Sequence, residues 1–164
     1  MRNLIYLFLT VLIVACSDDT KKPNESWLLV HTADNAQLTN SVTIVMPITN
    51  DIFAFTDRPY RKHLYMDGKQ YTSLWDDNDD TNNFYADPPN AVLTWVDEDK
   101  IKELEVVITG AIFDGNTISY TIINNSGIIT GDIVYVSLFI DDINDLGPDG
   151  SCFLCWPPPG MPNG

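Results

Sequence analysis

Seven short runs rich in β-branched and aromatic residues, separated by polar turn residues, dominate the middle of this chain. They cover residues 27–32, 42–46, 52–55, 91–96, 104–113, 117–123 and 133–140. Runs of this length and composition predict β-strands, and no long helical pattern lies between them. Short polar turns favour antiparallel pairing. We therefore expect an all-β domain over residues 27–146, an immunoglobulin-like antiparallel β-sandwich, with a closed β-barrel as the alternative.

Two of these runs show how side chains are distributed between faces. Ile118, Tyr120 and Ile122 alternate with polar residues, which predicts one buried and one solvent-facing side. Residues 133–140 are apolar at both odd and even positions, so we expect this strand to be covered on both sides. Between residues 113 and 117, Asp114-Gly115 predicts a hairpin turn, because glycine adopts a positive φ without steric cost.

Residues 67–76 predict the one helical insert. Asp67 and Gln70 have the spacing of a capping box, and Tyr71 and Trp75 stand four residues apart, as on one face of a helix. The alternative is a hairpin turn at Asp67-Gly68. We favour the short helix.

The chain is strongly acidic, with a net charge of −14 over 164 residues. A surface of this charge repels phosphate backbones, so we expect no nucleic-acid partner. It is compatible with cation binding and with simple solubility. The length left after a leader is enough for one domain with a hydrophobic core.

The N-terminus has the pattern of an export signal. Arg2 precedes an uncharged stretch, residues 4–14, that is too short to cross a bilayer as a permanent helix. Ile13-Val14-Ala15 before Cys16 resembles the lipobox of bacterial lipoproteins. The resemblance implies that residues 1–15 are a cleaved signal peptide and that Cys16 carries fatty acids such as palmitate. An ordinary secretory signal is the alternative.

The same resemblance predicts the location of the protein. Residues 16–26 form a polar tether, and the domain is held by lipid in the bacterial cell envelope, on either the periplasmic face or the outer surface of the outer membrane.

An acidic loop is the best candidate cation site. Asp76, Asn78, Asp80 and Asp87 occupy the first, third, fifth and twelfth positions of an EF-hand-like spacing, which supplies oxygen ligands for calcium. Thr81 stands where that motif has glycine, and Asp87 is shorter than the usual glutamate. A solvated acidic loop is the alternative.

The C-terminal residues 147–164 are rich in proline and glycine and contain Cys152-x-x-Cys155. In an oxidising envelope compartment this pair predicts a local disulfide. The alternatives are a copper or zinc site completed by Met161 or a histidine, and thiol–disulfide redox chemistry.

No catalytic motif accompanies the two histidines, His31 and His63. We therefore expect a non-catalytic binding or interaction module. Calcium is its one candidate cofactor. Tyr85 and Trp156 are the candidate contacts to a glycan or protein partner. Redox or soft-metal handling through Cys152 and Cys155 is the competing function.

Two motifs carry a further resemblance. The segment Phe55-Thr56-Asp57-Arg58-Pro59-Tyr60-Arg61 and the later Asp87-Pro88-Pro89-Asn90-Ala91 resemble elements of a group of small secreted or envelope proteins, in which serine stands at the Thr56 position. The resemblance implies a single secreted domain and no particular activity. It also implies that the two turns belong to one structural feature, in which we expect Arg58 or Arg61 to bond the Asp87 carboxylate or nearby carbonyl groups.

The arginines of the first motif admit other interpretations. Their guanidinium groups are suited to an anionic ligand. The structural alternative, which we favour, is that an arginine pairs with Asp57 or reaches the acidic loop at residues 76–87.

Overall fold

The computed structural model describes residues 26–56, 58–77, 83–124 and 130–144. Several predictions therefore fall outside the described residues. These are the signal peptide, the lipid attachment at Cys16, the tether to residue 25, and the tail with Cys152, Cys155, Trp156 and Met161. Asp57, Asn78 and Asp80 also lie outside.

The described chain is mostly β-structure with one short α-helix, as the sequence predicts. In chain order the elements are β1 (Ser26–Asn40), β2 (Thr43–Pro47), β3 (Ile52–Thr56), β4 (His63–Met66), α2 (Gly68–Thr72), the 3-10 helix η1 (Ser73–Trp75), β5 (Asn90–Asp97), β6 (Lys100–Phe113), β7 (Thr117–Ile123) and β8 (Gly131–Asn144). All seven expected strands are present. The short strand β4 is an addition, and β1 continues eight residues beyond its expected end.

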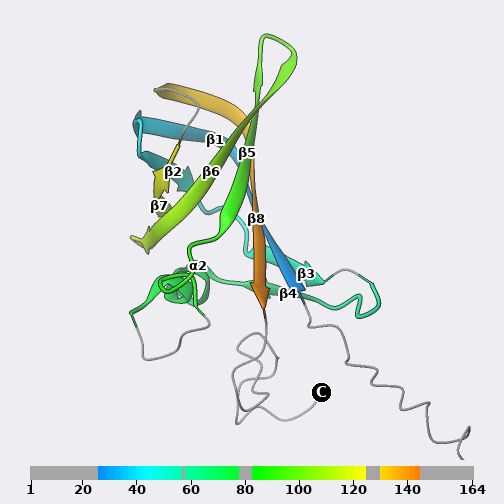
Figure 1. Ribbon diagram of the computed structural model, residues 1–164. Coiled ribbons are helices and arrows are strands. Elements are labelled where there is room, and N and C mark those ends of the chain that lie inside the picture. The colour runs from blue at the N-terminus through cyan, green and yellow to red at the C-terminus, as the bar shows by residue number, and fades with distance from the viewer. Residues whose placement is uncertain (1–25, 57, 78–82, 125–129, 145–164) are drawn as a thin grey trace, which may run out of the picture.

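The strands form one antiparallel sheet rather than the two separate sheets of a sandwich. Their order is β2-β7-β6-β5-β8-β1-β3-β4, and β2 also pairs with β1, so the pairings of six strands close into a ring (Figure 1). The hairpin of β3 and β4 continues from β1 outside this ring. Closure depends on the length of β1, because one strand must reach two partners along the same edge.

Strand β1 changes partner along that edge. Its first residues pair with β3, from Trp27 opposite Thr56 to Val30 opposite Phe53. Its last residues pair with β2, beginning with Gln37 opposite Val45. Between them, residues 31–33, 35 and 36 pair with β8 and with neither β2 nor β3. A branch in the sheet therefore lies beside the middle of β1.

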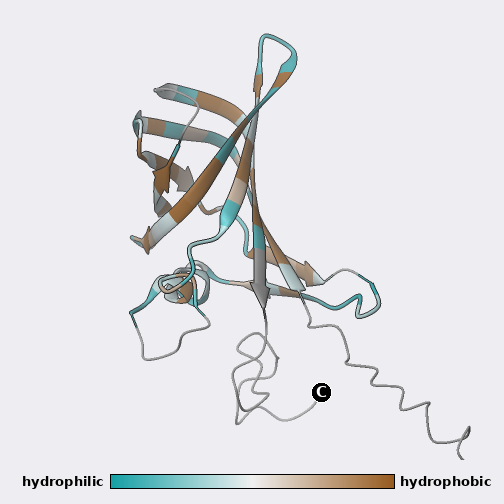
Figure 2. Cartoon of the chain, in the orientation of Figure 1, coloured by the Kyte–Doolittle hydropathy of each residue, from teal (hydrophilic) through white to brown (hydrophobic). Residues whose placement is uncertain are grey.

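The ring encloses the hydrophobic core. Side chains with no exposed surface include Leu29, Ile44, Met46, Leu93, Ile108, Ile118, Tyr120, Leu138 and Ile140. The alternation predicted for β7 is confirmed, since Ile118, Tyr120 and Ile122 all point inward. Burying a side chain of this size stabilises the fold by about 1.5–3 kcal/mol. Figure 2 shows the hydrophobic residues concentrated along the ring strands, with hydrophilic residues at the β5–β6 turn.

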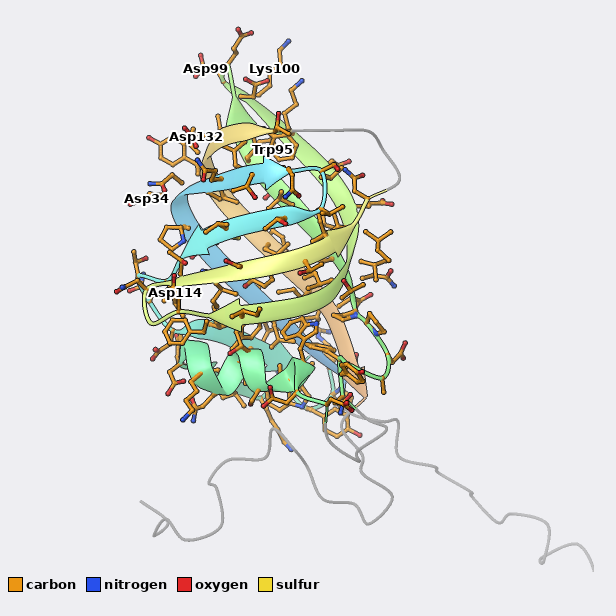
Figure 3. All side chains as sticks on the ribbon, turned by 90° about the vertical axis from the view of Figure 1, so that its left-hand side faces the viewer. Asp34, Trp95, Asp99, Lys100, Asp114 and Asp132 are labelled. Atoms are coloured by element: carbon orange, nitrogen blue, oxygen red, sulfur yellow. The ribbon has the colours of Figure 1, made fainter. Side chains whose placement is uncertain are left out.

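Helix α2 covers one end of the ring, below the strands in Figure 3. The capping box is confirmed: Gln70 N–H donates to the Asp67 carboxylate at 2.8 Å, and Asp67 N–H donates to the Gln70 side chain at 3.0 Å. The rings of Tyr71 and Trp75 meet edge-on at 5.3 Å, which places both on one buried face. Among the described helices, none has the length and apolar character needed to cross a membrane.

The β6–β7 hairpin turns at Asp114 and Gly115, as predicted. Gly115 has a φ of 102°, and the Asp114 carboxylate accepts hydrogen bonds from the N–H groups of Asn116 and Thr117 at 2.9 and 2.7 Å. These N–H donors hold the pKa of Asp114 below its usual range.

Strand β8 is not covered on both sides, contrary to the sequence prediction. Val136, Leu138 and Ile140 are buried, whereas Val134, Tyr135 and Phe139 are 45%, 71% and 44% exposed. Strand β8 has an extra residue between its pairings with Thr94 and Val96 of β5. This bulge brings Ile133 to the same inner face as Val136, Leu138 and Ile140, which is why buried residues occur at both odd and even positions.

Candidate functional site

A polar hollow of about 260 Å³ opens beside the branch in the sheet. Its wall is formed by residues 32–34 of β1, residues 49–50 of the β2–β3 connection and residues 135–137 of β8. It lies where β1 has left β3 and has not yet reached β2. The hollow is therefore a direct consequence of the shared edge of β1.

The side chains around this hollow are mostly hydrogen-bonding groups. Asp34 contributes a carboxylate and Asn50 a carboxamide, and both residues are exposed. The remaining polar residues of the lining are Thr32, Thr49, Tyr135 and Ser137, each with a hydroxyl group. Figure 3 places Asp34 at the outer edge of the ring. Such a lining offers acceptors and donors together, but one carboxylate only.

Tyr135 is the most unusual residue of the hollow. It has a φ of 53°, in the left-handed region that a bulky side chain rarely adopts. Its side chain is 71% exposed, so core packing does not require a tyrosine there. The bulge of β8 holds the aromatic ring of Tyr135 at the surface beside the hollow. Backbone strain of this kind is concentrated at binding and catalytic sites.

A second polar group lies inside the ring and is not part of the lining of the hollow. His31 of β1 is buried, and its Nδ1 is 2.8 Å from the Tyr120 hydroxyl of β7. Its Nε2 is 3.2 Å from the carbonyl oxygen of Pro47. Burial lowers the pKa of His31 to about 4, and the bond to Pro47 opposes this shift. The imidazole is therefore neutral at physiological pH.

Tyr71 of α2 extends this interior group. Its ring lies 6.2 Å from that of Tyr120, and burial raises the pKa of both hydroxyls. The neighbouring Tyr120 hydroxyl acts to lower the pKa of Tyr71, but the Tyr71 hydroxyl makes no well-formed hydrogen bond with a described residue. These groups have no access to substrate in the described structure, so we treat them as structural.

Of the predicted calcium ligands, only Asp76 and Asp87 are described, and both are exposed. The Asn83 carboxamide donates to the Asp76 carbonyl at 3.4 Å, and Phe84 N–H donates to the Leu74 carbonyl at 2.9 Å. These bonds bring the two ends of the acidic loop together. Within the described ranges, no three His, Cys, Asp or Glu residues are grouped to hold a metal ion.

The turn that carries Arg58, Arg61 and Lys62 connects β3 and β4. Thr56 closes it twice: its N–H donates to the Lys62 carbonyl at 3.0 Å, and its hydroxyl accepts from Lys62 N–H at 2.8 Å. A serine hydroxyl would accept the same bond. Arg58 and Arg61 are exposed, and the Lys62 ammonium lies 5.9 Å from the centre of the Tyr60 ring.

The prediction that this turn and Asp87 form a joint surface is wrong. Figure 1 places the turn at the far end of the β3–β4 hairpin, whereas the segment around Asp87 adjoins α2 on the opposite side. Pro89 instead accepts a hydrogen bond from Ile108 N–H at 3.0 Å, so the second motif guides the chain into β5. The two motifs therefore stabilise different parts of the sheet.

Tyr85, the described candidate for partner contact, is 55% exposed. It follows the acidic loop and is not part of the hollow. The residues of the hollow were missed because three separate segments form it. One signal was present in the sequence. Two consecutive polar residues, Asp34 and Asn35, stand between Ala33 and Ala36 and break the alternation of β1, which continues to Asn40.

Comparison of the chain with family models, with curated protein sequences and with solved structures gave no significant match.

Proposed function

We propose that this protein is a non-catalytic binding module, anchored in the cell envelope through Cys16, whose hollow binds a neutral polyhydroxylated ligand such as a saccharide unit. The observation that carries the proposal is the exposed ring of Tyr135, held on a strained backbone, in the same hollow as the carboxylate of Asp34 and the carboxamide of Asn50. An aromatic ring offers a flat apolar contact, and the polar groups supply directional hydrogen bonds.

The charge of the protein supports a neutral ligand. Asp34 and the net charge of −14 disfavour an anionic one. Binding is favoured over glycoside hydrolysis because hydrolysis commonly needs two carboxyl groups flanking the bond, and Asp34 is the one carboxylate in the described lining. An open hollow of this volume is expected to bind weakly, in the micromolar to millimolar range.

Titration calorimetry of the acyl-free protein against a panel of neutral saccharides tests the proposal. Tyr135→Ala and Asp34→Asn are expected each to weaken binding at least tenfold. Tyr85→Ala is the matched control, because it removes an exposed tyrosine outside the hollow. The absence of binding to any neutral saccharide, or equal loss with the control variant, contradicts the assignment.

The anchor has its own test. Intact-mass analysis of the membrane fraction is expected to show an acylated Cys16 as the first residue. Cys16→Ala is expected to prevent acylation and to release the protein from membranes. An unmodified mature N-terminus would remove the anchor from the proposal without affecting the hollow.

Calcium binding by the acidic loop is the second candidate function. It is favoured by the bonds of Asn83 and Phe84, which hold the ends of the loop together. Millimolar calcium is expected to raise the melting temperature, and Asp76→Asn with Asp87→Asn to abolish that rise. An unchanged melting temperature removes this candidate.

For the architecture, we propose the closed β-barrel in place of the sandwich. The ring of pairings supports it, because each of its six strands has a partner on both sides. Limited access to solvent at the edges of these strands is the expected consequence. Amide hydrogen exchange that is slow in β5, β6, β7 and β8 and fast along the outer edge of β4 would agree with a closed barrel.

A further inference from the structure

We propose that the β3–β4 hairpin contacts the surface of an anionic phospholipid bilayer and orients the domain on it. The inference rests on the proposed lipid anchor, which brings the bilayer within reach. Two features carry it. The first is a basic turn in the hairpin, defined as Arg58, Arg61 and Lys62. The second is an aromatic face, defined as Phe53, Phe55 and Tyr65 of the hairpin with Phe139 of β8.

The basic turn stands out in an acidic chain. Three of the nine Lys and Arg residues of the protein lie within five positions, and all three side chains are exposed. With Asp57 included, residues 57–62 carry a formal charge of +2, from three cations and one carboxylate. Anionic lipids attract such a cluster by about 1 kcal/mol for each Lys or Arg near the surface.

The aromatic face lies on the outer side of the sheet, next to this turn. Tyr65 of β4 is opposite Phe53 of β3, which is opposite Val30 of β1, which is opposite Phe139 of β8. Tyr65 is 64% exposed and Phe139 is 44% exposed. The rings of Phe53 and Phe55 are stacked at 5.6 Å, and those of Phe53 and Tyr65 lie 5.2 Å apart.

Aromatic side chains beside cations are typical of the membrane–water interface. The rings provide apolar area for the headgroup region, and tyrosine keeps its hydroxyl hydrated. The described outer face therefore combines both attractions at one end of the molecule.

The position of the tether points to a bilayer as the occupant. Trp27 pairs with Thr56, so the chain enters β1 beside the basic turn. The ten residues from Cys16 to Glu25 span at most about 35 Å when extended. The start of β1 is the described part nearest to the anchor along the chain, and the hairpin lies beside it in the sheet.

The charge at the opposite end supports the same orientation. Asp97, Glu98 and Asp99 form the β5–β6 turn and are exposed, and Figure 1 places this turn opposite the β3–β4 hairpin. Strand β5 alone has 8 residues, about 26 Å. This length is about three Debye lengths at physiological salt, so the acidic end does not cancel the attraction.

Vesicle co-sedimentation of the acyl-free protein tests the proposal. Vesicles of phosphatidylcholine with one-third phosphatidylglycerol are compared with vesicles of phosphatidylcholine alone. We expect binding to the anionic vesicles that weakens with salt. Arg58→Gln with Lys62→Gln should lower the partition coefficient about 25-fold, from about fivefold for each cation.

Two matched controls separate this contact from general electrostatics. Lys100→Gln with Lys102→Gln removes the same charge from exposed positions of β6, in the half of the molecule that carries the acidic turn, and should leave binding unchanged. Tyr65→Ser should weaken binding, whereas Tyr85→Ser should not. Circular dichroism melts of all four variants verify that each one folds.

Several results would overturn the proposal. These are equal binding to neutral and anionic vesicles, equal losses in the two lysine-containing double variants, and dimerisation of the protein that Tyr65→Ser abolishes. The last result would make the aromatic face an interface between copies. Because the protein in this test lacks acyl groups, failure of the Cys16 anchor appears in its mass and not in vesicle binding.

Discussion

His31 Nδ1 and the Tyr120 hydroxyl lie 2.8 Å apart in the interior of the ring, joining two residues of β1 and β7 that are 89 positions apart in the sequence. The Pro47 carbonyl, 3.2 Å from Nε2, is an acceptor only. Nε2 therefore carries the proton, and Nδ1 accepts the hydrogen of Tyr120. A neutral imidazole satisfies both partners, whereas a protonated one cannot accept from Tyr120.

The stability of the fold should fall between pH 6.5 and pH 4. An unfolded histidine takes up a proton near pH 6.5, whereas folded His31 has a pKa of about 4. Between these values the unfolded state binds more protons, so acidification favours unfolding; above pH 6.5 the effect is absent. The full contribution is about 3 kcal/mol. Urea unfolding from pH 7.5 to pH 4.5 measures it.

His31→Gln and His63→Gln distinguish this effect from that of the carboxylates. Glutamine at position 31 retains an acceptor and a donor without titrating, so its unfolding free energy should vary less with pH between 6.5 and 5. His63→Gln is the matched control, because it removes an exposed histidine that is not part of the interior group. Identical pH profiles for wild type and His31→Gln would refute the assignment.

Tyr120→Phe should destabilise the protein more than Tyr71→Phe. The first change leaves the buried Nδ1 of His31 without its donor, which costs about 1–3 kcal/mol. The second removes a buried hydroxyl that makes no well-formed hydrogen bond with a described residue, so its cost should be smaller. Thermal unfolding at pH 7.5 compares the two variants. Equal destabilisation would mean that the two hydroxyls act as one unit.

Local signals in the sequence predicted local structure correctly. The Asp67–Gln70 capping box and the Asp114-Gly115 turn both form as expected. Each depends on residues within three positions of one another, so no distant part of the chain decides it. The inward row on β7 belongs to the same class, because alternation in one strand fixes which side is apolar.

Features that depend on distant pairings were not predictable in this way. The sharing of one edge of β1 by β2 and β3 creates both the ring and the hollow, and nothing in residues 31–36 names those partners. The bulge at Tyr135 arises where β8 meets β5, and the apolar run at residues 133–140 predicted cover on both sides of a strand that has one exposed face. The pairing of His31 with Tyr120 is of the same kind, because the two residues are 89 positions apart and no local pattern joins them.

Gly68→Ala should destabilise the protein even though alanine favours helices. A Cβ at Gly68 would stand 2.7–2.9 Å from three ring carbons of Phe113, so α2 or that ring must move. Overpacking of this kind costs about 1–3 kcal/mol, against a gain of at most about 1 kcal/mol in helix propensity. Thermal denaturation measures the difference.

Gly110→Ala is the control for that substitution. Its Cβ would meet only Thr121, at an ordinary 3.8 Å. Phe113→Leu combined with Gly68→Ala should recover part of the loss by clearing the space. A melting temperature for Gly68→Ala at or above that of the wild type would show that α2 or the Phe113 side chain moves to accommodate the added Cβ without loss of stability.

Tyr135→Gly should stabilise the fold while it removes ligand binding. Glycine adopts the φ of 53° without the steric cost of a side chain, about 1–2 kcal/mol. The tyrosine side chain is 71% exposed, so little packing is lost. Tyr135→Ala retains most of the strain and should be less stable than Tyr135→Gly by about 1 kcal/mol.

The comparison of these two variants separates structure from function at the hollow. Both should lose saccharide binding in calorimetry, because both lack the ring, although their unfolding free energies differ. If Tyr135→Gly is instead the less stable variant, the tyrosine side chain supports the bulge, and its strained backbone would have a structural origin. If Tyr135→Gly stabilises the fold and abolishes saccharide binding, the strained tyrosine is retained for ligand binding and not for stability.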